Sequence, residues 1–287
     1  MHKRTHWLLT IKGLTMTHLP PRSFRTFNYI GLYTLYIKEI KRFLNIFTQT
    51  IVAPVITSVM FLSVFTLSIG RIQPTVNGLS FTQFLIPGLI CMTMIQNSFA
   101  NTSSAIVSGK MMGSITDLLM PPLSSLEIVI AHGLASITRG LLLTIVNLIG
   151  MSLFADISFA SISFIELFVF SVLTCWFMSM IGFISGVWAH TWDNLSSITT
   201  YIITPLSFLS GTFYSLDKLP AFFQKMALFN PLFYMIDGVR HSMTGYSNMA
   251  EYKSYSYMFE LLVLFGLCLI LSYIAWRILE KGWKLKS

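Results

Sequence analysis

Residues 43–70 read FLNIFTQTIVAPVITSVMFLSVFTLSIG, a run without a charged side chain that is bounded by Arg42 and Arg71. A helix needs about 20 apolar residues, rising about 1.5 Å each, to cross a hydrocarbon core about 30 Å thick. The run is long enough for one crossing, and we place a transmembrane helix at residues 47–69. A segment of this kind predicts an integral membrane protein.

The composition supports this prediction. Hydrophobic residues make up 54% of the chain and charged residues only 10%, against about 25% charged residues in ordinary soluble domains. The formal net charge of +8 could indicate nucleic acid binding, but the basic residues cluster at the two ends of the chain, as expected beside anionic headgroups. We therefore expect membrane lipid, and no nucleic acid, as a partner.

Five more apolar runs predict further spans and an all-α integral membrane fold. The six spans are placed at residues 47–69, 84–104, 128–155, 167–190, 195–216 and 258–278. Six spans bring both termini to one side, and the concentration of Lys and Arg before the first and after the last places that side in the cytoplasm. Residues 1–23 are expected to form a flexible extension, with Met1 and Met16 both open as the start. Residues 24–287 then form one transmembrane domain.

An amphipathic pattern precedes the first span. Apolar residues recur at spacings of three and four from Phe27 to Leu44, with Lys38, Lys41 and Arg42 outside the series. This pattern predicts a helix over residues 24–45 that lies in the cytoplasmic interface. The alternative is a soluble helix that packs on a neighbouring domain.

Two connections also show a pattern. In residues 108–126, the prolines at 121 and 122 stop any helix before them, so residues 115–120 form either a short helix or a plain loop. Ser124 and Glu127 then match a capping box that opens the third span. In residues 217–245, two apolar pieces too short to span are divided by Asn230-Pro231. They predict two re-entrant half-helices before the sixth span, with Arg240 near the outer interface.

Groups that could supply energy or chemistry are scarce. Arg139 is the charge that lies clearly inside a span, and we expect it to extend to the cytoplasmic interface. Polar residues do not converge at one depth in the sequence pattern, and no G-x-x-x-x-G-K-[ST] cradle for phosphate occurs. The sequence predicts a transport subunit without its own ATPase site, catalytic residue, metal site or bound cofactor. An ATP-independent lipid-modifying enzyme and a channel stay open as alternatives.

Residues 208–240, FLSGTFYSLDKLPAFFQKMALFNPLFYMIDGVR, resemble permeases of the ABC-2 type, a family that includes bacterial exporters of drugs, nodulation factors and polysaccharides. The likeness extends to residues 38–43, 84–88 and 109–121, and so covers nearly the whole chain from about residue 29. The sequence departs from the family at Ser215, where many members have proline.

The resemblance implies an exporter permease in the bacterial cytoplasmic (inner) membrane that moves an amphiphilic, lipid-like or glycan substrate. It would work as a homodimer with two cytoplasmic ABC ATPase subunits that carry ATP and Mg. The residues it implies for ATPase coupling are Ile115, Asp117, Leu118, Leu119, Pro121, Lys38, Glu39, Lys41 and Arg42. Those it implies for the outer gate and re-entrant region are Gly211, Phe213, Tyr214, Asn230, Pro231 and Arg240.

Overall fold

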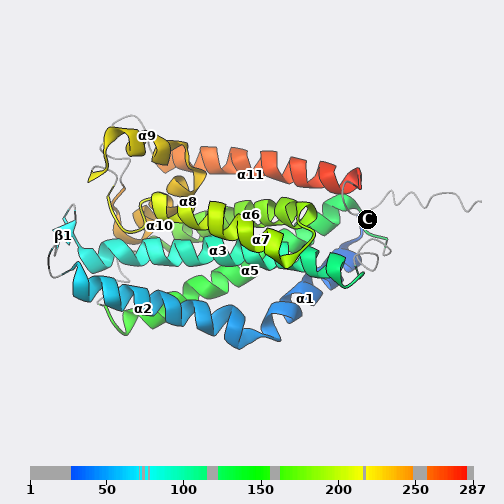
Figure 1. Cartoon of the computed structure of the whole chain (residues 1–287), viewed down its shortest axis with the longest axis horizontal. Coiled ribbons are helices and arrows are strands. Elements are labelled where there is room, and N and C mark those ends of the chain that lie inside the picture. The colour runs from blue at the N-terminus through cyan, green and yellow to red at the C-terminus, as the bar shows by residue number, and fades with distance from the viewer. Residues whose placement is uncertain are drawn as a thin grey trace, which may run out of the picture.

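The computed structural model describes residues 27–70, 72, 75–76, 78–114, 122–155, 162–215, 218–247 and 257–282. Long helices run side by side along the longest axis of the molecule (Figure 1). The helices are α1 Tyr29–Leu44, α2 Ala53–Ser68, α3 Phe81–Met111, α5 Ser125–Ser152, α6 Phe164–Trp188, α7 Trp192–Ile198, α8 Thr204–Leu209, α9 Ala221–Phe229, α10 Pro231–Thr244 and α11 Tyr257–Glu280. Two π-helical turns, Thr48–Val52 and Thr199–Ile203, precede α2 and join α7 to α8. The predicted helical membrane fold is confirmed, with one addition: a hairpin of β1 Thr75–Val76 and β2 Leu79–Ser80.

Among the described residues, four helices are long and apolar enough to cross a membrane. They are Thr48–Ser68, Ser125–Ser152, Phe164–Trp188 and Tyr257–Glu280, which correspond to the predicted first, third, fourth and sixth spans. The predicted second span lies in α3, which has sufficient length but carries many polar residues. The predicted fifth span, 195–216, is divided between α7, a π-helical turn and α8, and its helix already ends at Leu209. By length and composition, four of the six predicted spans are therefore candidate spans, and the number of six stays a prediction.

The centre of the bundle is the contact between α3 and α6. Two glycines of α6 make this contact close: a Cβ atom at Gly182 would lie 2.5 Å from the carbonyl oxygen of Phe99, and one at Gly186 would lie 3.0 Å from that of Ser103. Small residues at such contacts let the backbones of membrane helices approach each other, which increases their van der Waals attraction. The spacing of Gly182 and Gly186 thus sets how closely α6 packs on α3.

Replacing Gly182 with leucine is expected to separate α3 from α6 and to prevent correct folding. The Phe99 backbone cannot move aside as a flexible side chain could, so the new side chain has no space. The measurement is the monodisperse fraction and melting temperature of the detergent-solubilised protein. Gly266→Leu in α11 is the matched control, because a Cβ atom there meets nothing within 4 Å. Equal melting temperatures for the two variants would contradict this account of the packing.

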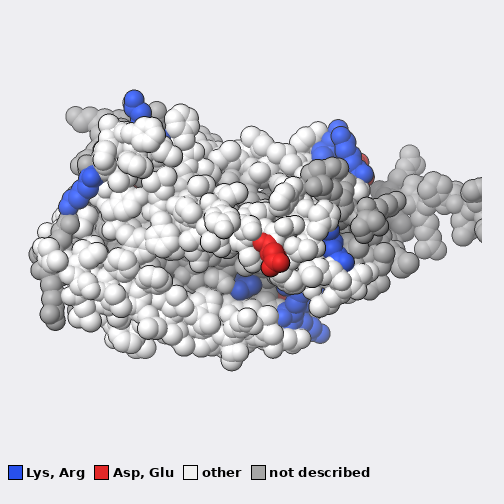
Figure 2. Space-filling view, viewed as in Figure 1, with Lys and Arg blue, Asp and Glu red and all other residues white. Residues whose placement is uncertain are grey.

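On the visible face, basic residues lie at both ends of the molecule, and an acidic and a basic patch lie between them on the half toward α1, while the rest of the surface is uncharged (Figure 2). The end with α1 also contains the start of α5 and the end of α11, and the opposite end contains β1 and α9 (Figure 1). At the α1 end the predicted capping box is confirmed: Glu127 N donates to Ser124 Oγ at 3.3 Å, and Ser124 N donates to Glu127 Oε2 at 2.7 Å. Asn28 N donates to Glu127 Oε1 at 2.6 Å, which ties the start of α1 to α5.

The two apolar pieces predicted between the fifth and sixth spans form α9 and α10. Asn230 separates them and caps α10, because its Oδ1 accepts from Leu232 N at 3.1 Å. Its Nδ2 donates to Ser210 Oγ at 2.8 Å, which holds this break against the end of α8. The two helices differ in burial: Phe229 of α9 is 89% exposed, whereas α10 lies largely in the core. The Asn-Pro division is confirmed, and insertion into the membrane stays a prediction.

Candidate functional site

An open groove of about 420 Å³, here called the polar groove, lies between α2, α3 and the segment from α7 to α8. Its walls mix apolar side chains with amides and hydroxyls. The lining residues are Gln49, Ala53, Pro54, Thr57, Ser58, Phe61, Leu89, Met92, Thr93, Gln96, Asn97, Ala100, Thr199 and Thr204.

Part of the polar lining comes from one face of α3, where Thr93 and Asn97 line the groove and Asn101 continues the same face. Thr93, Asn97 and Asn101 are spaced by four residues, so they lie above one another on the helix. Thr93 shares a hydrogen bond of 2.7 Å with Ser58 of α2, and Asn97 Nδ2 donates to the Thr93 carbonyl at 3.0 Å. Asn97 Oδ1 is thereby oriented toward a further donor, which α5 supplies.

That donor is Arg139, which is only 7% exposed. Its Nη2 donates to Asn97 Oδ1 at 2.7 Å and to the Thr50 carbonyl at 3.3 Å, and its Nη1 lies 3.5 Å from Asn101 Oδ1. The expectation that Arg139 extends to the membrane interface is therefore wrong. Carbonyl acceptors on neighbouring segments lie within reach of the guanidinium, and they replace the water that a surface position would offer.

Arg42 of α1 also binds Asn101. Its Nη2 donates to the Asn101 carbonyl at 2.6 Å and to Asn101 Oδ1 at 3.2 Å, and its Nη1 donates to Ser104 Oγ at 3.2 Å. Arg42, Asn101, Arg139 and Asn97 thus form one continuous chain of hydrogen bonds, here called the arginine–asparagine chain. It connects α1 to the wall of the polar groove.

Glu39 completes this contact on the α1 side. It is 4% exposed, and its Oε2 accepts from Arg42 Nε at 2.8 Å and lies 3.9 Å from His132 Nδ1. Burial alone would raise the pKa of this carboxyl, but the neighbouring His132 and Arg42 outweigh that effect and hold the pKa below its usual value. Glu39 is therefore a carboxylate that anchors α1.

The coupling residues implied by the resemblance divide into three groups. Glu39 and Arg42 face the bundle as described, while Lys38 and Lys41 line an open hollow on the outer side of α1. The remaining five, Ile115, Asp117, Leu118, Leu119 and Pro121, lie outside the described residues.

The structure brings several of the outer-gate residues together around Arg240. This side chain is 0% exposed and lies in the protein interior, and its predicted position near the outer interface stays a prediction. Its Nη2 donates to the Gly211 carbonyl at 2.7 Å, its Nη1 lies 3.9 Å from Asp237 Oδ1, and its Cζ lies 4.0 Å from the centre of the Phe84 ring. Asn230 and Pro231 begin α10, the helix that carries Arg240.

Phe213 and Tyr214 lie near this cluster. Among the described residues, neither forms a hydrogen bond or a ring contact with Arg240. The Phe213 ring stacks on Phe65 at 4.8 Å between centroids and on Phe208 at 5.3 Å. Tyr214 Oη donates to the Phe208 carbonyl at 3.1 Å. These two residues join the end of α8 to α2.

The sequence pattern did not lead us to predict that Asn97, Asn101 and Ser104 converge on two arginines. Their spacing of four and three residues places them on one face of a helix, which is a signal that the sequence does contain. Chemically, the cluster consists of hydrogen bonds between amides, hydroxyls and guanidiniums. Within the residues that the structure describes, no group of three or more His, Cys, Asp or Glu side chains is placed to hold a metal ion.

Comparison with known proteins finds matches over most of this chain. Residues 31–244 match the family model described as ABC-2 type transporter. The chain is 34% identical over 259 residues to "Inner membrane transport permease YadH" of Escherichia coli (strain K12), an alignment that covers 90% of this chain and 98% of that protein. It is 28% identical over 184 residues to "Nodulation protein J" of Rhizobium leguminosarum bv. viciae, covering 62% of this chain and 68% of that protein.

Proposed function

This chain belongs to the ABC-2 type transporter family and is a membrane transport subunit, and from that membership we propose that it is the permease of an ATP-driven exporter. The proposed cargo is an amphiphilic, lipid-like or glycan molecule that leaves the cytoplasm or the inner leaflet. The proposed topology has six spans, with both termini in the cytoplasm and α9 and α10 re-entrant. ATP and Mg are bound by two separate ABC ATPase subunits.

The arginine–asparagine chain is the observation that carries this proposal. An exporter driven from outside the membrane needs a mechanical connection between its cytoplasmic surface and its cargo pathway. Arg42 lies on α1, which is the predicted interfacial helix, and Asn97 lines the polar groove. The hydrogen bonds through Asn101 and Arg139 join these two places, so a displacement of α1 is transmitted to the groove wall.

The shape of the polar groove supports assembly as a homodimer. One wall of this open groove is α2, which belongs to a span in which only 22% of the apolar window is buried within the chain. Two copies that face each other through this side would enclose a pathway with polar walls and an apolar outer surface. A cargo with both polar and apolar parts matches walls of this mixed character.

The test is site-specific photo-crosslinking of the full chain in membranes of its native host. A benzophenone side chain at position 118 is expected to crosslink to a protein that binds ATP, because the family resemblance places the ATPase at that loop. The control position is Leu153, which is 78% exposed and follows α5 at the end far from α1. Crosslinking of an ATP-binding protein at neither position, or equally at both, would overturn the proposal.

A second measurement separates the exporter from an ATP-independent enzyme or channel. The tagged chain is purified in mild detergent, and the amount of ATP-hydrolysing protein per permease is determined. An exporter is expected to retain one ATPase subunit per permease. A protein that purifies alone, and whose vesicles release or modify lipid without ATP, would support one of the alternatives instead.

A further inference from the structure

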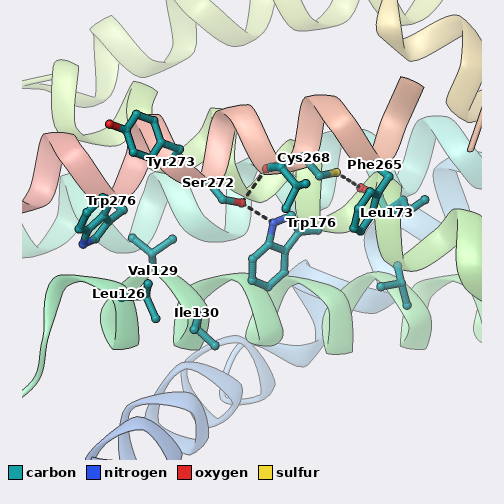
Figure 3. A pocket seen from close by; sticks show the side chains of 12 residues that line it. Leu126, Val129, Ile130, Leu173, Trp176, Phe265, Cys268, Ser272, Tyr273 and Trp276 are labelled. Carbon is teal, nitrogen blue, oxygen red and sulfur yellow. Dashed lines mark hydrogen bonds between the residues drawn. The ribbon is translucent and has the colours of Figure 1, made fainter. Parts of the chain in front are cut away.

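A second groove, of about 620 Å³, lies between α5, α6 and α11 and is here called the apolar groove. Figure 3 shows its side chains converging from these helices. The lining residues are Leu126, Val129, Ile130, Val172, Leu173, Trp176, Phe265, Cys268, Leu269, Ser272, Tyr273 and Trp276. All three helices are among the candidate spans, so the groove lies where hydrocarbon is the solvent.

The polar atoms in the middle of this groove are already paired. Trp176 Nε1 donates to Ser272 Oγ at 2.8 Å, and Ser272 Oγ donates to the Cys268 carbonyl at 2.7 Å (Figure 3). The Trp176 ring lies against α5 because Gly133 leaves space for it: a Cβ atom there would come within 2.6 Å of the ring. The groove therefore offers hydrocarbon and ring surface to an occupant and requires no hydrogen bond from it.

One end of the groove has a different character. Tyr273 and Trp276 lie together at the end far from Phe265 (Figure 3), and the guanidinium carbon of Arg277 lies 5.8 Å and 5.7 Å from their ring centres. Glu280 lies 3.5 Å from Arg277 Nη1. Lys281 is exposed one helical turn after Arg277, since its backbone N donates to the Arg277 carbonyl at 3.1 Å. These three side chains together carry one net positive charge beside this mouth. Aromatic and basic residues at the end of a span are typical of the headgroup level of a bilayer.

We propose that the apolar groove binds an anionic membrane phospholipid, with an acyl chain along Trp176 and the phosphate at Arg277 and Lys281. The apolar interior matches the chain, and the positive mouth matches the charge of the phosphate. A second copy of this chain matches the groove poorly, because a two-fold interface here would place two positive mouths beside each other. The lipid fills the space that α5 and α11 leave between them and holds α11 in the bundle.

The test is native mass spectrometry of the purified full chain with dioleoyl phosphatidylglycerol or dioleoyl phosphatidylcholine added. Wild-type protein is expected to retain the anionic lipid in preference to the zwitterionic one. Leu269→Trp fills the groove and is expected to abolish retention of both lipids. Leu262→Trp is the matched control, because residue 262 lies two helical turns away on the same side of α11, is 63% exposed and does not line the groove.

A second pair of variants tests the headgroup contact. Arg277→Gln is expected to keep lipid bound but to lower the preference for phosphatidylglycerol about fivefold, the effect of one basic residue near an anionic surface. Lys225→Gln, on α9 at the opposite end, is expected to leave the preference unchanged. Wild-type retention in Leu269→Trp, or an unchanged preference in Arg277→Gln, would overturn the proposal. A dimer that only Leu269→Trp disrupts would also overturn it and would identify the groove as a protein interface.

Discussion

Arg240→Leu is expected to lower the free energy of unfolding by about 3–5 kcal/mol, the cost of removing one partner of a buried ion pair. The guanidinium of Arg240 is fully buried, donates to the Gly211 carbonyl and lies over the Phe84 ring. Its loss leaves the Asp237 carboxylate in the core without its nearby positive charge. The measurement is equilibrium unfolding in mixed detergent micelles, followed by tryptophan fluorescence.

Two variants make this result specific. Lys225→Leu removes an exposed basic residue of α9, and it is expected to change stability by less than about 0.5 kcal/mol, as surface substitutions do. Asp237→Asn in the Arg240→Leu background removes the buried negative charge, and it is expected to restore part of the lost stability. If Arg240→Leu unfolds at the same denaturant concentration as Lys225→Leu, the cluster does not hold α10 in place.

Features that depend on neighbouring residues in the chain were predictable from the sequence. The candidate spans Thr48–Ser68 and Tyr257–Glu280 follow from continuous hydrophobicity, because only 22% of the apolar window of each is buried within the chain. The capping box at Ser124 and the break at Asn230 follow from hydrogen bonds that close within three residues. In each case the interacting groups are close in sequence, so the pattern contains the physical cause.

Features that depend on distant partners could not be predicted in this way. Arg139 looks like an isolated charge in the sequence, and the acceptors on Thr50 and Asn97 become neighbours only when α5 packs on α3. The hydrogen bonds of the α3 amides are similar: Asn101 meets Arg42 and Arg139 only when α1 and α5 pack on α3. Arg240 is buried for the same reason, since the Phe84 carbonyl and ring come from a helix far away in the chain.

Asn101→Leu is expected to have the second large effect, a loss of about 3 kcal/mol of stability, because buried charged donors that lose an acceptor are costly. Asn101 Oδ1 accepts from Arg42 and lies within reach of Arg139, so one substitution interrupts the arginine–asparagine chain at its centre. The matched control is Asn147→Leu in α5. Asn147 is equally buried, but among the described residues its Oδ1 accepts no hydrogen bond, and its Nδ2 donates to the Leu143 carbonyl within α5, so its removal is expected to cost little.

A double-mutant cycle tests whether the arginine–asparagine chain couples α1 to the groove wall or only fills the core. Arg42→Met and Arg139→Met are combined, and the coupling energy between them is expected to be about 1–2 kcal/mol, within the range for residues of one hydrogen-bond network. The two arginines share no hydrogen bond among the described contacts, but their like charges act on each other directly. The cycle is therefore repeated in the Asn101→Leu background, and the part of the coupling that is lost there passes through Asn101. A coupling near zero would mean that α1 is held by Glu39 and its apolar face alone. Movement of α1 would then have no direct route to the wall of the polar groove.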